Sequence, residues 1–255
     1  MNDFMTLRNY FIISLTASHL VSDFLLQTGK MAASKHKPVQ FIKHLFITAA
    51  ALYIITGAFH IWILPLLFFI FHGIIDLLKI KLFKKNNKQL IPFLFDQILH
   101  LTSIVIAAFV IEYYSTSSLA DVSFWIRQFG ANYLYFLLWL SAIILITRFG
   151  SLLVDMAVKP FLEQIEADNS KRGFINGGKI IGTLERILIF LFIVSDNFSA
   201  VGFLIAAKSI FRFGELSNPA NRKEAEYIII GTMISFLLAI TVGLGFNLAV
   251  RWISG

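Results

Sequence analysis

Histidine and aspartate occur four residues apart at three places in strongly apolar sequence. The pairs are His19 with Asp23, His72 with Asp76 and, in the opposite order, Asp96 with His100. A helix places residues at this spacing on one face. His44 lies in a fourth apolar run. Because ionisable groups inside a membrane are costly and usually functional, we expect these side chains to face one another.

Imidazole and carboxylate groups together form a ligand set that suits zinc, manganese or iron. The chain contains no cysteine that could add a thiolate. The predicted divalent-metal ligands are His19, Asp23, His44, His72, Asp76, Asp96 and His100. This set is large enough for one ion or two.

A bound divalent ion lowers the pKa of water toward ~7 and neutralises phosphate oxygens. One carboxylate would then act as general base. The candidate catalytic residues are Asp23, Asp76 and Asp96, and the sequence does not separate base from ligand. The predicted function is metal-dependent hydrolysis of a phosphate-containing or lipid substrate at the membrane.

Two other functions fit the same sequence. A transporter or a proton- or ion-coupled carrier would use these residues as a relay, but the outer halves of the predicted spans contain few polar residues. A structural or partner-binding membrane protein would dock through its longest polar segment, residues 158–178. Gln27, Lys30, Lys79 and Gln97 are expected to orient ligands or substrate, whereas His36 and His60 lie in predicted turns and are not expected to bind metal.

Membrane helices are the elements that must position these residues. Hydrophobic residues make up 57% of the 255 positions and charged residues 15%, whereas a soluble domain has about 25% charged residues. With ~20 residues per crossing, we predict an all-α polytopic bundle of six to eight transmembrane helices. The net charge of +7 is explained by basic loops at a bilayer, so no nucleic-acid partner is expected.

The apolar runs divide the chain into three parts. Residues 1–157 form an amino-terminal bundle with spans near 9–28, 39–56, 61–82, 92–112 and 133–153, and residues 158–178 form a polar cytoplasmic linker. Residues 179–255 form carboxy-terminal membrane helices. Runs 180–194 and 200–213 are short for a ~30 Å core, so two thin crossings and one re-entrant hairpin both stay open.

Lysine and arginine residues gather in alternate loops. If the loop at residues 30–37 is cytoplasmic, only Arg8, Arg127 and Arg251 fall on the opposite side. The positive-inside rule then places both termini outside the cytoplasm. The same topology puts the carboxylate of each His/Asp pair nearer the cytoplasm than its histidine, so the three pairs match in depth.

A basic cluster follows the polar linker. Its members are Lys179, Arg186, Lys208 and Arg212. One interpretation is a pocket for an anionic lipid or another phosphate-containing ligand, with arginine as a bidentate clamp. The alternative is an ion pair from Glu185 to Lys208 or Arg212 that joins two helices.

Three motifs resemble a bacterial membrane family catalogued as domain of unknown function 3307. They are His19-Leu-Val-Ser-Asp23-Phe-Leu-Leu-Gln27, His72-Gly-Ile-Ile-Asp76 and Phe95-Asp96-Gln97-Ile-Leu-His100. The resemblance covers about the first 120 residues, and the tail looks like the extension of longer members. It implies a location in the bacterial inner membrane and no particular activity. The chain resembles more loosely the bacterial membrane-bound metal-dependent hydrolases, which also use histidine and aspartate on hydrophobic helices.

Overall fold

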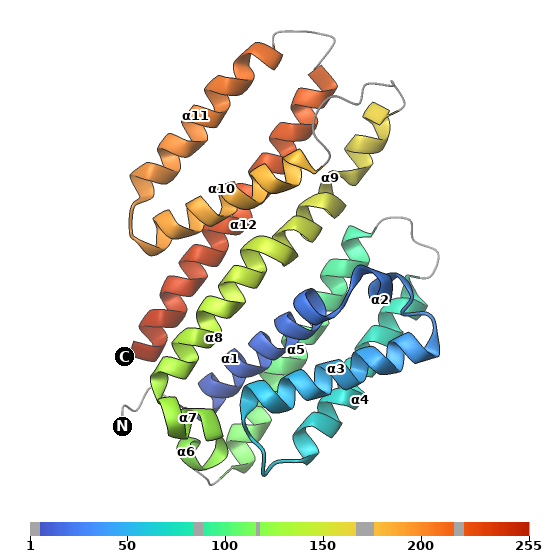
Figure 1. Cartoon of the computed structure of the whole chain (residues 1–255), viewed down its shortest axis with the longest axis vertical. Helices are drawn as coiled ribbons and strands as arrows, with labels where there is room; N and C mark the ends of the chain where they lie inside the picture. Colours follow the sequence, from blue (N-terminus) through green and yellow to red (C-terminus); the bar gives the residue numbers. More distant parts are fainter. Residues whose placement is uncertain (1–5, 84–88, 116–117, 167–175, 217–221, 255) are drawn as a thin grey trace. The chain divides into compact units, whose positions relative to one another are not determined.

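The structure, a computed structural model of the chain, describes residues 6–83, 89–115, 118–166, 176–216 and 222–254. All regular elements in these ranges are helices, as predicted (Figure 1). Five are long and apolar enough to cross a membrane: Pro38–Thr56, Ile63–Leu82, Leu90–Tyr114, Ala131–Glu163 and Lys223–Ser254. The protein is therefore an all-α polytopic helix bundle, and its expected six to eight crossings stay a prediction.

The chain divides into two compact units. The first comprises residues 1–144 and 249–255. Its elements are α1 (Leu7–Leu20), the π-helical turn η1 (Val21–Leu26), α2 (Gly29–Ala33), α3 (Pro38–Thr56), α4 (Ile63–Leu82), α5 (Leu90–Tyr114), α6 (Leu119–Val122), α7 (Phe124–Phe129) and α8 (Ala131–Ile144). Local sequence sets several ends: Thr6 caps α1, Pro38 opens α3, and Gly57 ends it with a positive φ of 58°.

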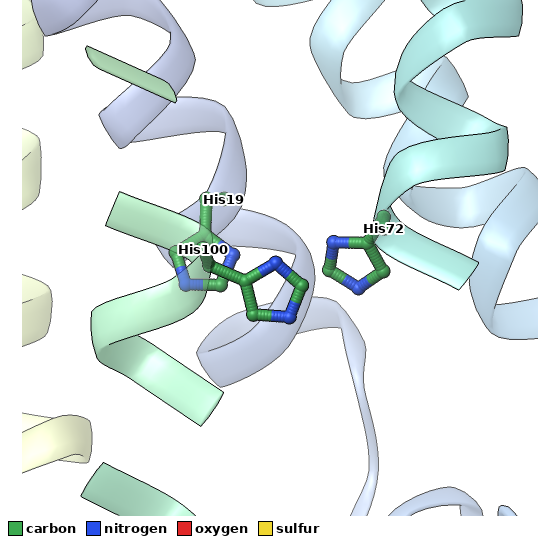
Figure 2. A group of neighbouring side chains, drawn as sticks. All are labelled: His19, His72 and His100. Carbon is green, nitrogen blue, oxygen red and sulfur yellow. The ribbon is translucent and has the colours of Figure 1, made fainter. Parts of the chain in front are cut away.

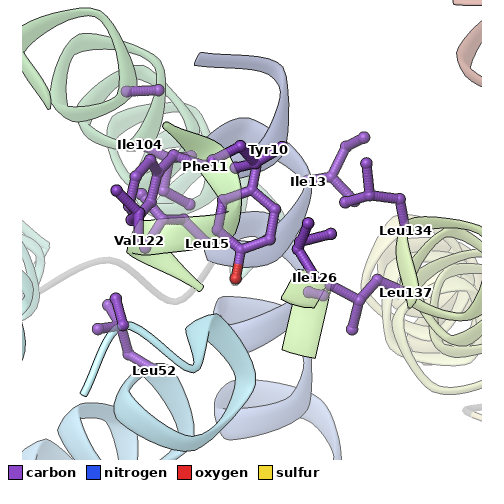
Figure 3. Close-up of a cluster of buried hydrophobic side chains, with 14 of the residues drawn as sticks. Tyr10, Phe11, Ile13, Leu15, Leu52, Ile104, Val122, Ile126, Leu134 and Leu137 are labelled. Atoms are coloured by element: carbon purple, nitrogen blue, oxygen red, sulfur yellow. The ribbon is translucent and has the colours of Figure 1, made fainter. Parts of the chain in front are cut away.

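Helix α1 is the centre of the first unit and packs against α3, α5 and α8. Its first half lies in an apolar core (Figure 3) made by buried residues such as Tyr10, Phe11, Leu15, Leu52, Ile104, Val122, Ile126, Leu134 and Leu137. The Tyr10 hydroxyl donates to the Thr56 carbonyl and lies 2.8 Å from Ser123 Oγ. Tyr10 thereby joins α1 to the end of α3 and the start of α7.

The second half of α1 continues into η1 and carries His19 and Asp23. The helices that flank it bury polar side chains at this end and expose large apolar ones on their outer faces, among them Phe46, Phe71, Ile74, Ile98 and Phe109. An apolar exterior of this extent fits a lipid environment. The first unit thus has an apolar core at one end of α1 and a polar centre at the other.

The second unit comprises residues 145–248. Its elements are the π-helical turn η2 (Leu145–Phe149), α9 (Gly150–Glu166), α10 (Gly177–Val194), α11 (Phe198–Leu216) and most of α12 (Arg222–Ser254). Helices α10 and α11 pack together over a small core of Ile189, Ile193, Val201, Phe236 and Ala239. These two helices have 18 and 19 residues, longer than the predicted runs and about 27 Å in length at 1.5 Å per residue.

The predicted domain limits at residues 157 and 178 stay predictions. Residues 158–166 of the expected linker continue α9 as helix. Residues 167–175 of that linker lie outside the described part of the chain. The sequence pattern placed the end of the fifth span at residue 153 because polar residues begin soon afterwards, yet helical backbone extends beyond the apolar run.

Candidate metal centre

The structure brings all seven predicted ligands together at the polar end of the first unit. They come from α1, η1, α3, α4 and α5, and Figure 2 shows the rings of three of them lying beside one another. Three overlapping groups each have ligand atoms within 4.8 Å of one another: His19, His72 and His100; Asp23, His44 and His72; and Asp76, Asp96 and His100.

One close group is formed by His44, His72 and Asp23. Their atoms His44 Nε2 and His72 Nε2 are 3.0 Å apart, and Asp23 Oδ1 lies 3.6 Å from the first and 3.7 Å from the second. A point equidistant from three atoms at these separations is about 2 Å from each, which is the usual length of zinc–nitrogen and zinc–oxygen bonds. The side chains of His44, His72 and Asp23 can therefore hold one ion without moving apart.

Asp76 faces the same point from α4. Its Oδ2 atom lies 3.6 Å from both His44 Nε2 and His72 Nε2. Lys35, between α2 and α3, donates to both Asp76 oxygens at 2.9 and 2.8 Å. Burial opposes the charged form of Lys35, but the carboxylates of Asp76 and Asp23 outweigh it and raise the pKa of Lys35 above its ordinary value.

Asp96 repeats this arrangement on α5. Its Oδ2 atom accepts from Lys79 Nζ at 2.8 Å and from Gln97 Nε2 at 3.2 Å. Its Oδ1 atom lies 3.5 Å from His100 Nε2, and neither atom has a hydrogen-bond partner among the described residues. The same is true of His19 Nδ1. Buried polar atoms almost always find a partner, so each of these three atoms is suited to bind a water molecule or an ion.

Neighbouring amides orient two of the histidines. His19 Nε2 lies 3.2 Å from Gln97 Oε1 and donates to it, which leaves Nδ1 as the lone-pair nitrogen. The Gln27 amide nitrogen lies 3.1 Å from His44 Nδ1. Rotating this amide by 180° presents its oxygen instead, and His44 Nδ1–H then donates to it while Nε2 is free to bind metal.

A cavity of about 10 Å³ adjoins the histidines on the side of the apolar core. It is lined by Leu15, Ser18, His19, Thr48, Leu52, Phe68, His72, His100, Ser103 and Ile104. A volume of this size holds about one water molecule. The apolar residues of the lining belong to the core of the first unit or pack against it.

Local backbone structure explains part of this geometry. Asp23 belongs to the π-helical turn η1, and π-helical turns are frequent at functional sites because the extra residue redirects a side chain. Ser22 Oγ lies 2.9 Å from Asp23 Oδ1 and steadies it. Thr28 then caps the short helix α2, which turns the chain back over the site.

Most of the expected supporting residues are also in place. Gln27, Lys79 and Gln97 contact ligands as described above, whereas Lys30 is exposed. His36 and His60 are exposed and lie outside the three ligand groups. Lys35 was missed, because its position among the lysines at residues 30–37 indicates a cytoplasmic loop and gives no sign that one of them is buried.

The predicted basic cluster lies in the second unit. Lys208 Nζ pairs with Glu185 Oε2 at 2.5 Å, which confirms the ion pair between α10 and α11, and Lys179 pairs with Asp155. Arg186 is 2% exposed. The side chain of Arg212 lies outside the described part of the chain.

The comparison with protein families agrees with the motifs of the first unit. Residues 11–128 match the model of a family described as "Protein of unknown function (DUF3307)". The resemblance expected from the His/Asp motifs is thus confirmed over a segment that contains all seven predicted ligands. Searches of curated proteins and of solved structures found no match. The DUF3307 description names no activity, so the chemistry must be argued from the side chains themselves.

Proposed function

We propose that this protein is a membrane-embedded, metal-dependent hydrolase that acts on a phosphate-containing or lipid substrate. The observation that carries the proposal is the convergence of His44, His72 and Asp23, whose ligand atoms are 3.0 to 3.7 Å apart. Catalytic zinc sites keep three protein ligands and leave a fourth position for water. Two histidines and one carboxylate are such a set.

Asp76 is suited to the role of general base. Its Oδ2 atom faces the ion position at 3.6 Å from two of the ligand nitrogens, while Lys35 holds both of its oxygens. A water molecule in the fourth position would lie between the ion and this carboxylate. The metal would supply an acidified water near neutral pH, and Asp76 would accept its proton.

The balance of charge favours one ion over two. The carboxylates of Asp23, Asp76 and Asp96 face the ammonium groups of Lys35 and Lys79, which leaves one negative charge. One divalent ion that carries a hydroxide brings the total to zero. Two such ions would leave a buried excess of positive charge, which is costly in a low-dielectric environment. The third group, with Asp96 and His100, therefore serves to accept protons and hold water.

Lys35 and Lys79 support a phosphate-containing substrate. Their side chains are 12% and 28% exposed, so both lie beside the site and keep part of their surface accessible. An anionic substrate would meet these cations first. Together with the charge distribution of the loops, this arrangement supports a site that opens toward the cytoplasm from the bacterial inner membrane.

A carrier receives less support from the same geometry. It requires a polar path from the histidines to the opposite side of the membrane. The cavity beside the histidines has three hydroxyl groups in its lining, from Ser18, Thr48 and Ser103. The other residues that line it besides the histidines are Leu15, Leu52, Phe68 and Ile104, which belong to the apolar core of the first unit or pack against it.

Metal content of the purified protein tests the proposal. Protein prepared in detergent without chelators should carry about one divalent ion per chain, measured by elemental analysis. His72→Gln and Asp23→Asn should each lose most of it, whereas His60→Gln, an exposed histidine outside the ligand groups, should retain it. Metal content below half an equivalent that does not differ among these proteins would contradict the metal site.

Hydrolysis of bis(p-nitrophenyl) phosphate then tests the chemistry. Wild-type protein loaded with zinc, manganese or iron should release p-nitrophenol. Asp76→Asn should retain the ion but lose at least ~100-fold in rate, since general-base catalysis contributes about 10²–10⁴-fold. A metal-loaded wild type without activity on phosphate esters or lipid esters would favour a carrier or a partner-binding role.

A further inference from the structure

The second unit contains a large cavity that the proposed metal centre does not involve. Its volume is about 410 Å³, and it is lined by residues of α9, α10, α11 and α12. It lies where α10 and α12 begin, at Gly177 and Arg222. The polar part of its lining includes Ser151, Asp155, Lys179, Glu185, Arg186 and Lys208.

Arg186 is the most deeply buried of these charges. Its Nε donates to the Ile146 carbonyl at 2.5 Å, its Nη1 to Ser235 Oγ at 2.9 Å, and its Nη2 to Ser151 Oγ at 2.8 Å. Nη2 also donates to Thr183 Oγ1, at 3.1 Å. All four acceptors are neutral, and one of the five N–H groups, on Nη1, has no acceptor among the described residues. Within the described ranges, no carboxylate lies within 4 Å of its guanidinium. A buried charge without a counter-charge is unfavourable, so this cavity favours an anion.

The other charges in the lining cancel in pairs. Lys179 pairs with Asp155, and Lys208 pairs with Glu185. Arg186 therefore leaves the described lining with one excess positive charge. Gly178 and Gly182 keep side chains off the adjoining wall, and a Cβ added at Gly182 would meet only Arg186 Nη1, at 3.4 Å. The remaining N–H of Nη1 therefore has space beside it at Gly182.

We propose that this cavity binds a phosphate group, and that the phosphate is the headgroup of an anionic lipid. The remaining Nη1–H of Arg186 can donate to one phosphate oxygen, and such a hydrogen bond between two charged groups is stronger than one between neutral groups. Beside the cavity α10 exposes Ile180, Ile181 and Leu184, each more than half accessible. These side chains supply an apolar surface for the acyl chains of the lipid.

Two charge changes of opposite sign test the proposal without removing Arg186, whose loss would leave the Ile146 carbonyl without its partner. Lys208→Gln lowers the positive charge of the cavity. Glu185→Gln frees Lys208 and raises it. Dioleoyl phosphatidic acid should bind Lys208→Gln about fivefold more weakly and Glu185→Gln about fivefold more tightly, since one basic residue contributes about 1 kcal/mol to binding of an anionic lipid. Native mass spectrometry with phosphatidylcholine as the competing neutral lipid measures both.

Matched controls make the same charge changes on α9 outside the cavity. Lys159→Gln and Glu163→Gln alter exposed residues that do not line it. Affinities for phosphatidic acid that do not differ between cavity and control variants would overturn the proposal, as would equal binding of phosphatidylcholine. Competition by inorganic phosphate, but not by chloride at equal ionic strength, would assign the site to the free ion. The metal content of the first unit should be unchanged throughout, so the two proposals fail independently.

Discussion

Lys35 Nζ lies 2.9 and 2.8 Å from the two carboxylate oxygens of Asp76, a residue 41 positions away in the chain. Both side chains are largely buried, with 12% and 1% exposed. Removing one partner of such a pair leaves the other charge uncompensated. Lys35 is therefore the counter-charge of the proposed general base, and a bound ion would share that role.

Lys35→Gln should destabilise the protein most when metal is absent. The expected loss in the presence of a chelator is up to about 3 kcal/mol, since breaking a buried ion pair costs about that amount. Zinc should reduce the loss, because the ion supplies positive charge beside Asp76. Thermal unfolding in detergent with and without zinc measures the effect. Lys30→Gln, which changes an exposed lysine of the preceding helix α2, is the control, and an equal loss in both variants would argue against the pair.

Asp23→Asn should be less stable than the wild type when zinc is bound, and no less stable than the wild type when metal is absent. Zinc at 100 times its Kd stabilises a single-site protein by about 2.7 kcal/mol, and this gain should disappear in the variant. In a chelator the variant should equal or exceed the wild type, because it removes one of three carboxylates that face only two ammonium groups. Unfolding midpoints that are lower for Asp23→Asn under both conditions would contradict this expectation.

The sequence was most informative where short-range pattern decides structure. Helix α3 begins at Pro38 and ends at Thr56, before Gly57, so its limits match the predicted span within one residue. The histidine and aspartate pairs converge because helical spacing and alternating helix direction together set the face and depth of each side chain. Helical spacing is a property of a short segment, and helix direction follows from counting the helices along the chain.

The features that were missed depend on contacts between distant segments. Lys35 reaches Asp76 only because α2 turns the chain back, and its sequence does not differ from an ordinary basic loop. The π-helical turns η1 and η2 have no sequence signature, yet they place Asp23 and present the Ile146 carbonyl to Arg186. Such geometry follows from tertiary packing rather than from composition or periodicity.

Tyr10→Phe should weaken the fold without affecting the metal centre. The Tyr10 hydroxyl forms hydrogen bonds with the Thr56 carbonyl and with Ser123 in the apolar core. Ser123 Oγ still donates to the same carbonyl at 3.1 Å after the change, so the loss should be about 1 kcal/mol. Thermal unfolding and elemental analysis of the same sample check both parts. Tyr53→Phe removes an exposed hydrogen bond to Phe59 and should cost less; a loss of metal in Tyr10→Phe would show that the core and the centre are coupled.

Gly57→Ala and Gly130→Ala separate backbone strain from steric conflict. Both glycines have positive φ, of 58° and 56°. Gly57, with ψ of 16°, is left-handed and an alanine there costs about 1–2 kcal/mol. Gly130 has ψ of −142°, close to a region found almost only for glycine, and an alanine there costs about 1–3 kcal/mol. A Cβ at Gly57 would lie 2.4 Å from Trp125 Cδ1, whereas a Cβ at Gly130 would meet nothing within 4 Å. Gly57→Ala should therefore lose about 1–3 kcal/mol beyond its own backbone penalty, the usual cost of overpacking. Adding Trp125→Ala should abolish most of that excess, although it also removes the indole bond to the Ile54 carbonyl. A loss at Gly57→Ala no larger than the left-handed penalty of about 1–2 kcal/mol would mean that Trp125 moves aside without resistance, and that the tight approach of α7 to the end of α3 does not contribute to stability.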